Sequence, residues 1–180
     1  WDDRDIVHVL TTEALISSGA TWQVDPGLII KMDFAAITIG SQRTTVIIGD
    51  PTRPNDDPVV FTSVYDDNFG GDTNNDGFAG VNPVAVRPRP GDWSGIVEIG
   101  GSVFGGQLVP DTETTLLMDE AIVKFAGGQT RDGVVRNALI IGTTSDTGPG
   151  FFQITRNQFI DNLDTAISIQ PEVLRVDNPK

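Results

Sequence analysis

Short apolar runs, broken by glycine and proline, are the feature that most restricts the fold of this chain. Their length and β-branched content are typical of strands, and turn residues bound nearly all of them. Residues 11–19 fit a short helix or an edge strand equally well. The sequence therefore predicts an almost entirely β chain. The runs are GLIIKM (27–32), AAITIG (35–40), TTVIIG (44–49), PVVFTS (58–63), GIVEIG (95–100), NALIIG (137–142) and AISIQ (166–170).

Three of these segments also share a pattern that suggests a repeat. RNALII (136–141) aligns with RNQFID (156–161) at an offset of 20, and DEAIVK (119–124) aligns with the first at an offset of 17. A repeat near 20 residues with one short strand in each turn indicates a solenoid, in which stacked strands bury a continuous core. We expect Asn137 and Asn157 to stack as a ladder. A β-sandwich with similar strands remains the alternative.

The charge of the chain limits its partners. Its 180 residues, enough for one domain with a real core, carry a formal net charge of −13 and no cysteine. Such a balance disfavours nucleic acid and anionic membranes, because phosphates need neutralising cations. No apolar run reaches the roughly 20 residues that span a bilayer. An acidic protein without thiol chemistry fits an extracellular location and calcium binding.

The stretch YDDNFGGDTNNDGFAG (65–80) holds four aspartates and no basic residue. Within it, DTNNDG (72–77) matches the first half of a calcium loop. Pro83 occupies the position where a helix–loop–helix site has its glutamate, so further oxygens must come from elsewhere. A solvated turn is the alternative. We expect a calcium site formed by side chains of this stretch and of the later PGDW motif: Asp66, Asp67, Asp72, Asn74, Asp76 and Asp92.

The sequence offers little for catalysis. The only histidine, His8, fits a half-buried position of a strand. Zinc sites, Cys–His nucleophiles and a serine elbow are excluded or nearly so. Two carbohydrate chemistries stay open: hydrolysis by paired carboxylates, and the elimination by lyases similar to pectate lyase, which use calcium and an arginine or lysine base. The cations available for it are Lys124, Arg131, Arg136 and Arg156, and we expect them to be exposed charges on a solenoid face.

Three segments carry a resemblance to a known family. WQVDPGLIIKMDFAAITIG (22–40), PVVFTSVYDDNFGGDTNNDG (58–77) and RPRPGDWSGIVEIGG (87–101) resemble a right-handed parallel β-helix module of very large bacterial surface and secreted proteins. The match covers about residues 20–170 and is most specific between residues 59 and 99. The resemblance implies an extracellular location and a structural or adhesive role, and does not imply an enzyme.

The domain organisation and function expected from these observations are as follows. Residues 1–19 form an edge or cap, residues 20–170 a β-helix with a calcium-loop insertion at 65–92, and residues 171–180 a tail. The chain is expected to be a non-enzymatic, calcium-stabilised module at the cell surface, assembling end to end into a filament. Its partners are other copies, neighbouring domains or cell-surface glycans. A polysaccharide-binding or polysaccharide-cleaving β-helix is the alternative.

Overall fold

The computed structural model describes residues 2–40, 43–53, 56–78, 81–98, 102–104, 107–109, 114–129, 137–142 and 150–169. Every regular element within these ranges is a strand, so the all-β prediction is confirmed for this part of the chain. The described residues accordingly contain no helix long and apolar enough to cross a membrane.

Fourteen of the sixteen strands belong to three sheets, in which all neighbouring strands are parallel. Sheet A contains β1 (Val7–Leu10), β4 (Ile29–Met32), β7 (Val59–Ser63), β12 (Ala121–Lys124) and β15 (Gln158–Ile160) in that order. Sheet B contains β2 (Ala14–Ile16), β5 (Ala36–Ile39), β8 (Gly95–Glu98), β13 (Leu139–Ile141) and β16 (Ile167–Ile169). Sheet C contains β3 (Thr21–Val24), β6 (Thr45–Ile48), β11 (Thr115–Asp119) and β14 (Phe151–Thr155). The remaining strands, β9 (Ser102–Phe104) and β10 (Gln107–Val109), form an antiparallel pair between β8 and β11.

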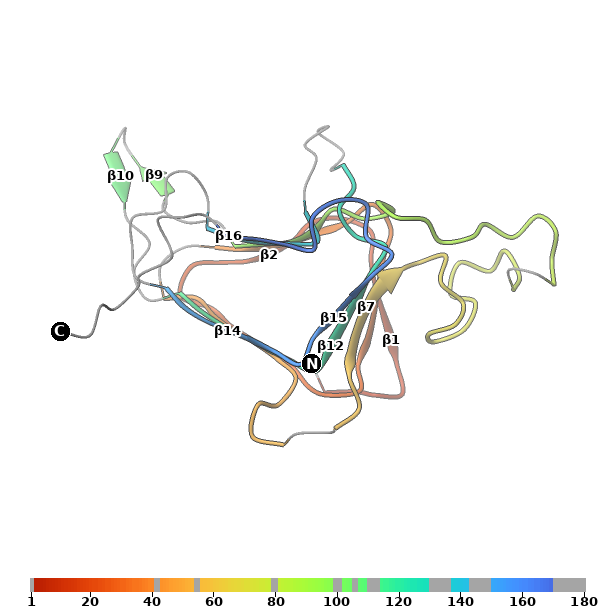
Figure 1. Ribbon diagram of the computed structural model, residues 1–180, viewed down its shortest axis with the longest axis horizontal. Coiled ribbons are helices and arrows are strands. Elements are labelled where there is room, and N and C mark those ends of the chain that lie inside the picture. The colour runs from red at the N-terminus through yellow and green to blue at the C-terminus, as the bar shows by residue number, and fades with distance from the viewer. Residues whose placement is uncertain are drawn as a thin grey trace.

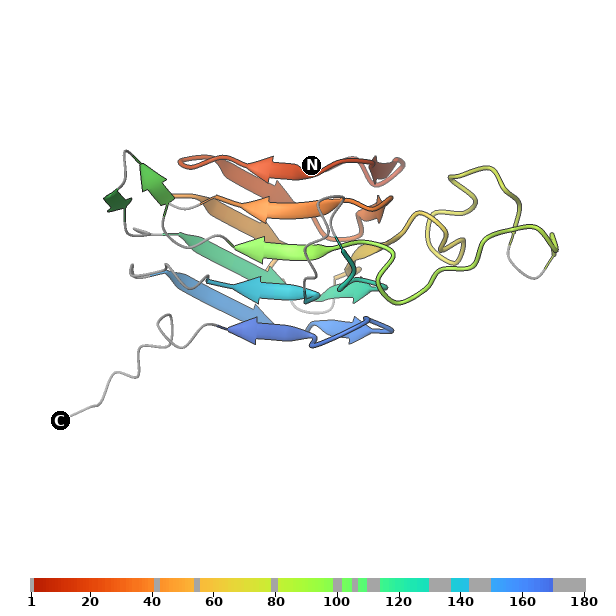
Figure 2. The ribbon, with the colours of Figure 1, turned by 90° about the horizontal axis from the view of Figure 1, so that it is seen from above.

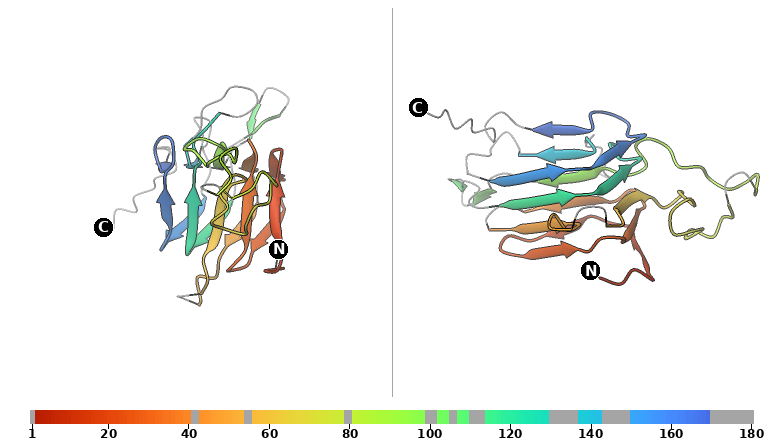
Figure 3. Two further views of the ribbon diagram at one scale, coloured as in Figure 1. Left: turned by 90° about the vertical axis from the view of Figure 1, so that its right-hand side faces the viewer. Right: turned by 60° about the horizontal axis from the view of Figure 1, so that its bottom comes forward.

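The chain passes through sheets A, B and C in turn and then returns to sheet A. Viewed along the stacking direction, the sheets form the three sides of a triangle (Figure 1). From the other directions, equivalent strands lie above one another in layers (Figures 2 and 3). This arrangement is consistent with a parallel β-helix or solenoid. It differs from a sandwich, which packs two sheets that are commonly antiparallel.

The core lies inside the triangle, where apolar side chains of successive turns stack. One register position of sheet A brings together His8, Ile30, Phe61, Val123 and Phe159. The three middle residues have no exposed surface, and Phe159 packs against them. His8 is half-buried at the edge of the sheet, as its alternating strand pattern predicts.

The predicted repeat with one strand in each turn is wrong, because each turn contains three strands, one from each sheet. The turn length itself varies: Val7 pairs with Ile29, 22 residues later and close to the predicted 20, whereas later turns are longer. The segment 136–141 contains β13 of sheet B, whereas 119–124 and 156–161 contain β12 and β15 of sheet A. Ala121 and Asn157 face each other in successive turns and are 36 residues apart. The expected ladder of Asn137 and Asn157 is therefore wrong as well. Asn157 instead accepts a bond from the nitrogen of Ala121 and donates to the carbonyl of Met118, each at 2.8 Å.

Two further segments take defined places in this stack. Residues 1–19 supply β1 and β2, which are the edge strands of sheets A and B. Between β7 and β8 the chain leaves the triangle at the corner of sheets A and B and projects outward (Figures 1 and 2). This projection contains the predicted insertion at 65–92. The tail predicted at 171–180 lies outside the described residues.

Candidate metal site

All six predicted metal ligands lie in the projection between β7 and β8, but the structure divides them. Asp66 follows β7 directly and is completely buried. Its Oδ2 accepts a hydrogen bond from Thr62 Oγ1 at 2.7 Å and lies 3.3 Å from Lys124 Nζ. Its Oδ1 accepts from both nitrogens of Asn68, at 2.9 and 3.3 Å. Protein donors therefore already surround the carboxylate of Asp66.

Hydrogen bonds and the charge of Lys124 together keep Asp66 ionised. Burial by itself raises the pKa of this carboxyl group, but the hydrogen bonds from Thr62 and Asn68 and the charge of Lys124 outweigh burial and hold the pKa below its ordinary value of 3.8. Lys124 also lies over the rings of Phe69 and Phe125, 5.1 and 4.8 Å from their centroids. Asp66 is thus an ionised partner of a lysine that comes from the next strand of sheet A.

A second lysine supports the projection from the opposite side. Lys31 pairs with Thr62 in sheet A, has no exposed surface, and donates to the carbonyl oxygen of Gly71 at 2.5 Å. Burial lowers the pKa of Lys31, while the charges of Asp67, Asp66 and Asp72 act to raise it. Asp67 is half-buried near this lysine. The sequence stretch lacks basic residues, but the fold supplies two from outside it.

Asp92 holds the returning end of the projection. Its Oδ2 accepts from Ser63 Oγ at 2.7 Å and from the backbone nitrogen of Arg89 at 2.9 Å. Asp92 also acts on Tyr65, whose pKa is raised by burial and by the charges of Asp33, Asp92 and Asp76. The role of Asp92 in the structure is thus to tie residue 89 to the end of β7.

The turn at 72–77 keeps the geometry that its sequence predicts. Asp72 accepts from the backbone nitrogen of Asp76 at 3.2 Å and from that of Gly77 at 2.9 Å. Gly77 has φ 87°, and Asn75 has φ 58°. Asp76 Oδ2 accepts from the nitrogen of Val86 at 2.8 Å. These bonds close the turn.

Two side-chain oxygens of this turn have no hydrogen-bond donor among the described residues, although both are enclosed. They are Asn74 Oδ1 and Asp76 Oδ1. Leaving such atoms unsatisfied costs about 1–3 kcal/mol each, and a hard cation satisfies them well. Each oxygen of Asp72 accepts one bond and keeps a lone pair available. Asp72, Asn74 and Asp76 therefore offer the type of ligand oxygen that calcium prefers.

The carboxylates alone do not make a complete site. In the described part of the chain, no group of three or more Asp, Glu, His or Cys side chains is placed to hold a metal. Calcium takes six to eight oxygens, so backbone carbonyls and water would have to supply the remainder. Sequence analysis did not place Lys31 or Lys124 beside the acidic stretch. The only signal for this role was a lysine within each of the apolar runs IIKM and AIVK.

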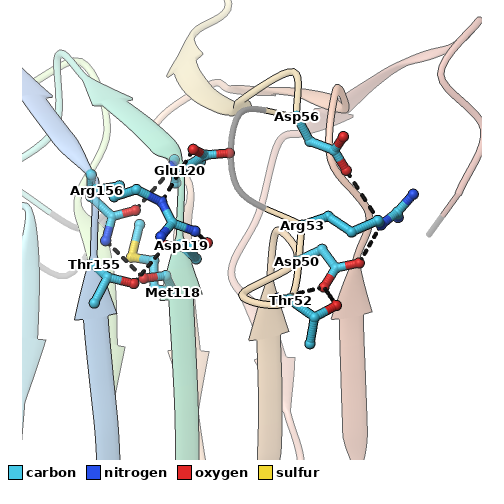
Figure 4. Close-up of polar contacts among 11 residues, drawn as sticks. Asp50, Thr52, Arg53, Asp56, Met118, Asp119, Glu120, Thr155 and Arg156 are labelled. Carbon is cyan, nitrogen blue, oxygen red and sulfur yellow. Dashed lines mark hydrogen bonds and ion pairs between the residues drawn. The ribbon is translucent and has the colours of Figure 1, made fainter.

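Where the structure describes them, the cations considered for catalysis form ion pairs with carboxylates. Arg156 lies 3.1 Å from Glu120 and also forms an ion pair with Asp119, which is almost completely buried (Figure 4). Lys124 is paired with Asp66. Arg131 and Arg136 lie outside the described residues. A second polar group in Figure 4 joins Arg53 to Asp50 and Asp56 at 2.6 and 3.5 Å.

A hollow of about 180 Å³ beside Arg156 is lined by Asp56, Pro58, Glu120, Ala121, Ile122, Arg156 and Gln158. Its arginine is already bound by two carboxylates, and its lining contains no aromatic residue. It therefore offers no aromatic face on which a sugar ring could stack.

Comparison with protein-family models, with curated proteins and with solved structures gives no significant match.

Proposed function

We propose that the chain is a right-handed parallel β-helix that serves as a calcium-stabilised structural or adhesive module outside the cell. Three parallel sheets visited in a fixed order support the helix. Connections between parallel strands are right-handed in almost all proteins, which supports the hand. The module has no catalysis of its own, and other copies, adjoining domains or cell-surface glycans are its partners.

The enclosed oxygens of Asn74 and Asp76 carry the calcium part of this proposal. We assign Asp72, Asn74 and Asp76 as side-chain ligands. Asp66 and Asp92 hold the loop in place through their bonds to Lys124 and Ser63. A turn with two carboxylates and one amide suits a weak site. Extracellular modules have such sites, with dissociation constants of roughly 10⁻⁴–10⁻³ M, and fill them in millimolar calcium.

Thermal unfolding in calcium and in chelator tests this function. Calcium at a hundredfold excess over the dissociation constant, which is about 10 mM for a constant of 10⁻⁴ M, stabilises by about 2.7 kcal/mol. This corresponds to a Tm change of about 5–10 °C for a domain of this size. We expect that change for the wild type and its loss in Asp76→Asn. Asp57→Asn, an exposed aspartate outside the loop, is the control and should keep the response. A wild-type Tm that is equal in calcium and in chelator contradicts the proposal.

A further inference from the structure

The base of the projection, residues 66–71, lies against the outer face of sheet A, and we call this segment the strap. At its first residue, Asp66 forms an ion pair with Lys124, which belongs to β12. At its last residue, the carbonyl oxygen of Gly71 accepts a hydrogen bond at 2.5 Å from Lys31, which belongs to β4. The strap itself follows β7. It is therefore attached to three neighbouring strands.

The strap also reaches β1, the first strand of the sheet. A Cβ built on Gly70 would lie 2.4 Å from Cγ2 and 3.3 Å from Cγ1 of Val7, so the backbone of Gly70 is packed against this half-buried side chain. Gly70 has φ 67°, a conformation that glycine adopts without strain. One short segment thus contacts four of the five strands of sheet A, namely β1, β4, β7 and β12.

Strand β1 is weakly held without this contact. Among the described strands it pairs only with β4, over four residues. Val9 within it is 41% exposed, and Ile6 just before it is 52% exposed. A short strand with one partner and little buried surface opens more easily than a strand inside a sheet. The contact between Gly70 and Val7 is therefore a substantial part of what fastens β1 to the stack.

The turn at 72–77 follows the strap directly and folds back on it. Thr73 Oγ1 lies 3.5 Å from the carbonyl oxygen of Val64, which precedes the strap, so the two ends of the strap come together. Without an ion, the carboxylates of this turn repel each other. A bound cation removes that repulsion and holds the turn closed. Because Gly71 is the residue before the turn, a closed turn also fixes the position of the strap.

We propose that calcium bound at this turn tightens the strap and thereby controls the pairing of β1 with β4. The inference rests on the proposed calcium site and names the part of the fold that the ion regulates. In millimolar calcium β1 stays paired. When calcium is removed β1 opens first, and the edge of β4 then presents unpaired N–H and C=O groups to any other strand. The coupling is reciprocal, so a displaced strap weakens calcium binding.

Hydrogen exchange of single backbone amides, followed by NMR, tests this control. Three amides close the first turn, one on each side of the triangle. They are the nitrogens of Asp33, bonded to Leu10 at 2.9 Å in sheet A, of Gly40, bonded to Ile16 at 2.8 Å in sheet B, and of Thr45, bonded to Ala20 at 2.9 Å in sheet C.

Only the amide of Asp33 reports on the strand that the strap holds. We expect its exchange to be about tenfold or more slower in calcium than in chelator, with little change at Gly40 and Thr45. Calorimetric titration shows separately whether calcium binds. Equal slowing of all three amides, or no slowing at Asp33 although calcium binds, overturns the control by the strap and leaves the calcium site standing. Absence of calcium binding overturns both.

Two neighbouring glycines supply a matched pair of variants. Gly71 has φ 72° and nothing within 4 Å of a built Cβ, so Gly70→Ala and Gly71→Ala introduce the same backbone strain. Only Gly70→Ala pushes the strap away from Val7. It should speed the exchange of Asp33 in calcium about tenfold relative to Gly71→Ala and leave the amides of Gly40 and Thr45 protected, which shows an intact fold. Equal exchange at Asp33 in the two variants overturns the contact with β1.

Discussion

At the scale of single residues, Lys31 and Lys124 change the meaning of the acidic stretch. The sequence shows carboxylates without compensation, but these two lysines flank Thr62 of β7 and reach the base of the projection. They neutralise the half that contains Asp66 and Asp67. The turn at 72–77 lies beyond these two lysines, and its enclosed oxygens of Asn74 and Asp76 are the ones we propose as calcium ligands.

The pair of Lys124 and Asp66 should contribute strongly to stability. Lys124 is 13% exposed and Asp66 is completely buried. Removing one partner of a buried pair leaves an uncompensated charge, so Lys124→Met should lower the free energy of unfolding by up to about 3 kcal/mol. Adding Asp66→Asn should restore part of this loss. Urea denaturation measures both. Arg53→Ala, which breaks an exposed pair, is the control, and an equally small effect of Lys124→Met contradicts the account.

Asp66 also predicts a dependence on acid. Its folded pKa is lower than the ordinary 3.8, so the folded state favours the carboxylate. The resulting stability is present above pH 3.8 and is lost as the pH falls through the folded pKa. Asp66→Asn should therefore be less stable than the wild type at neutral pH but lose less stability below pH 3.8. Urea midpoints measured against pH give this comparison, and parallel curves for the two proteins would exclude the assignment.

At the scale of the elements, the corners between sheets share one backbone feature. Phe34, Phe125 and Asp161 follow strands of sheet A and have φ 50°, 61° and 54°. Gly49, Glu120 and Arg156 follow strands of sheet C and have φ 78°, 48° and 55°. A left-handed residue turns the chain sharply, so the same geometry recurs at equivalent corners although the residue types differ.

Gly49 should be the most sensitive of these corners. A Cβ at this position would lie 2.1 Å from the carbonyl oxygen of Asp119 in the next turn. Gly19 has a similar φ of 79° with open space around it. Gly19→Ala should cost about 1–2 kcal/mol from the left-handed backbone alone, and Gly49→Ala clearly more because neighbouring turns must separate. Equal losses in chemical denaturation would show that the turns are not in this close contact.

The strands were largely predictable from the sequence, but their order in space was not. Runs such as TTVIIG and PVVFTS contain β6 and β7, because short β-branched segments between turn residues are typical of strands. The alignment of the repeats failed because strands of all three sheets share one apolar pattern, so 136–141 and 156–161 align although they belong to different sheets. The projection between β7 and β8 also makes successive turns unequal.

The candidate site could be predicted only where its residues are neighbours in the sequence. Asp72, Asn74 and Asp76 lie on one turn, so their spacing alone indicates that they lie close together. The partners of Asp66 depend on the register of β4, β7 and β12, which no local pattern encodes. The partners of Asn162 could not be predicted for the same reason. Its side chain accepts a bond from the nitrogen of Ala126 and donates to the carbonyl of Val123, both in the preceding turn.

At the scale of the whole molecule, the stack and the projection differ in what they contain. Layers of parallel strands bury a continuous core, while the projection between β7 and β8 contains the acidic turn at 72–77 and the exposed side chains of Val81 and Val84. The nitrogen of Val86 bonds to Asp76. A cation bound by Asp76 would therefore also hold residue 86 in place.

Calorimetric titration of the whole chain with calcium tests most directly whether the turn at 72–77, rather than Asp66, binds the ion. The account predicts one weak site, with a dissociation constant of roughly 10⁻⁴–10⁻³ M, that is lost in Asp76→Asn and retained in Asp66→Asn, because Asp66 is bound by Lys124. Absence of calcium binding to the wild type, or loss in Asp66→Asn with retention in Asp76→Asn, would contradict it.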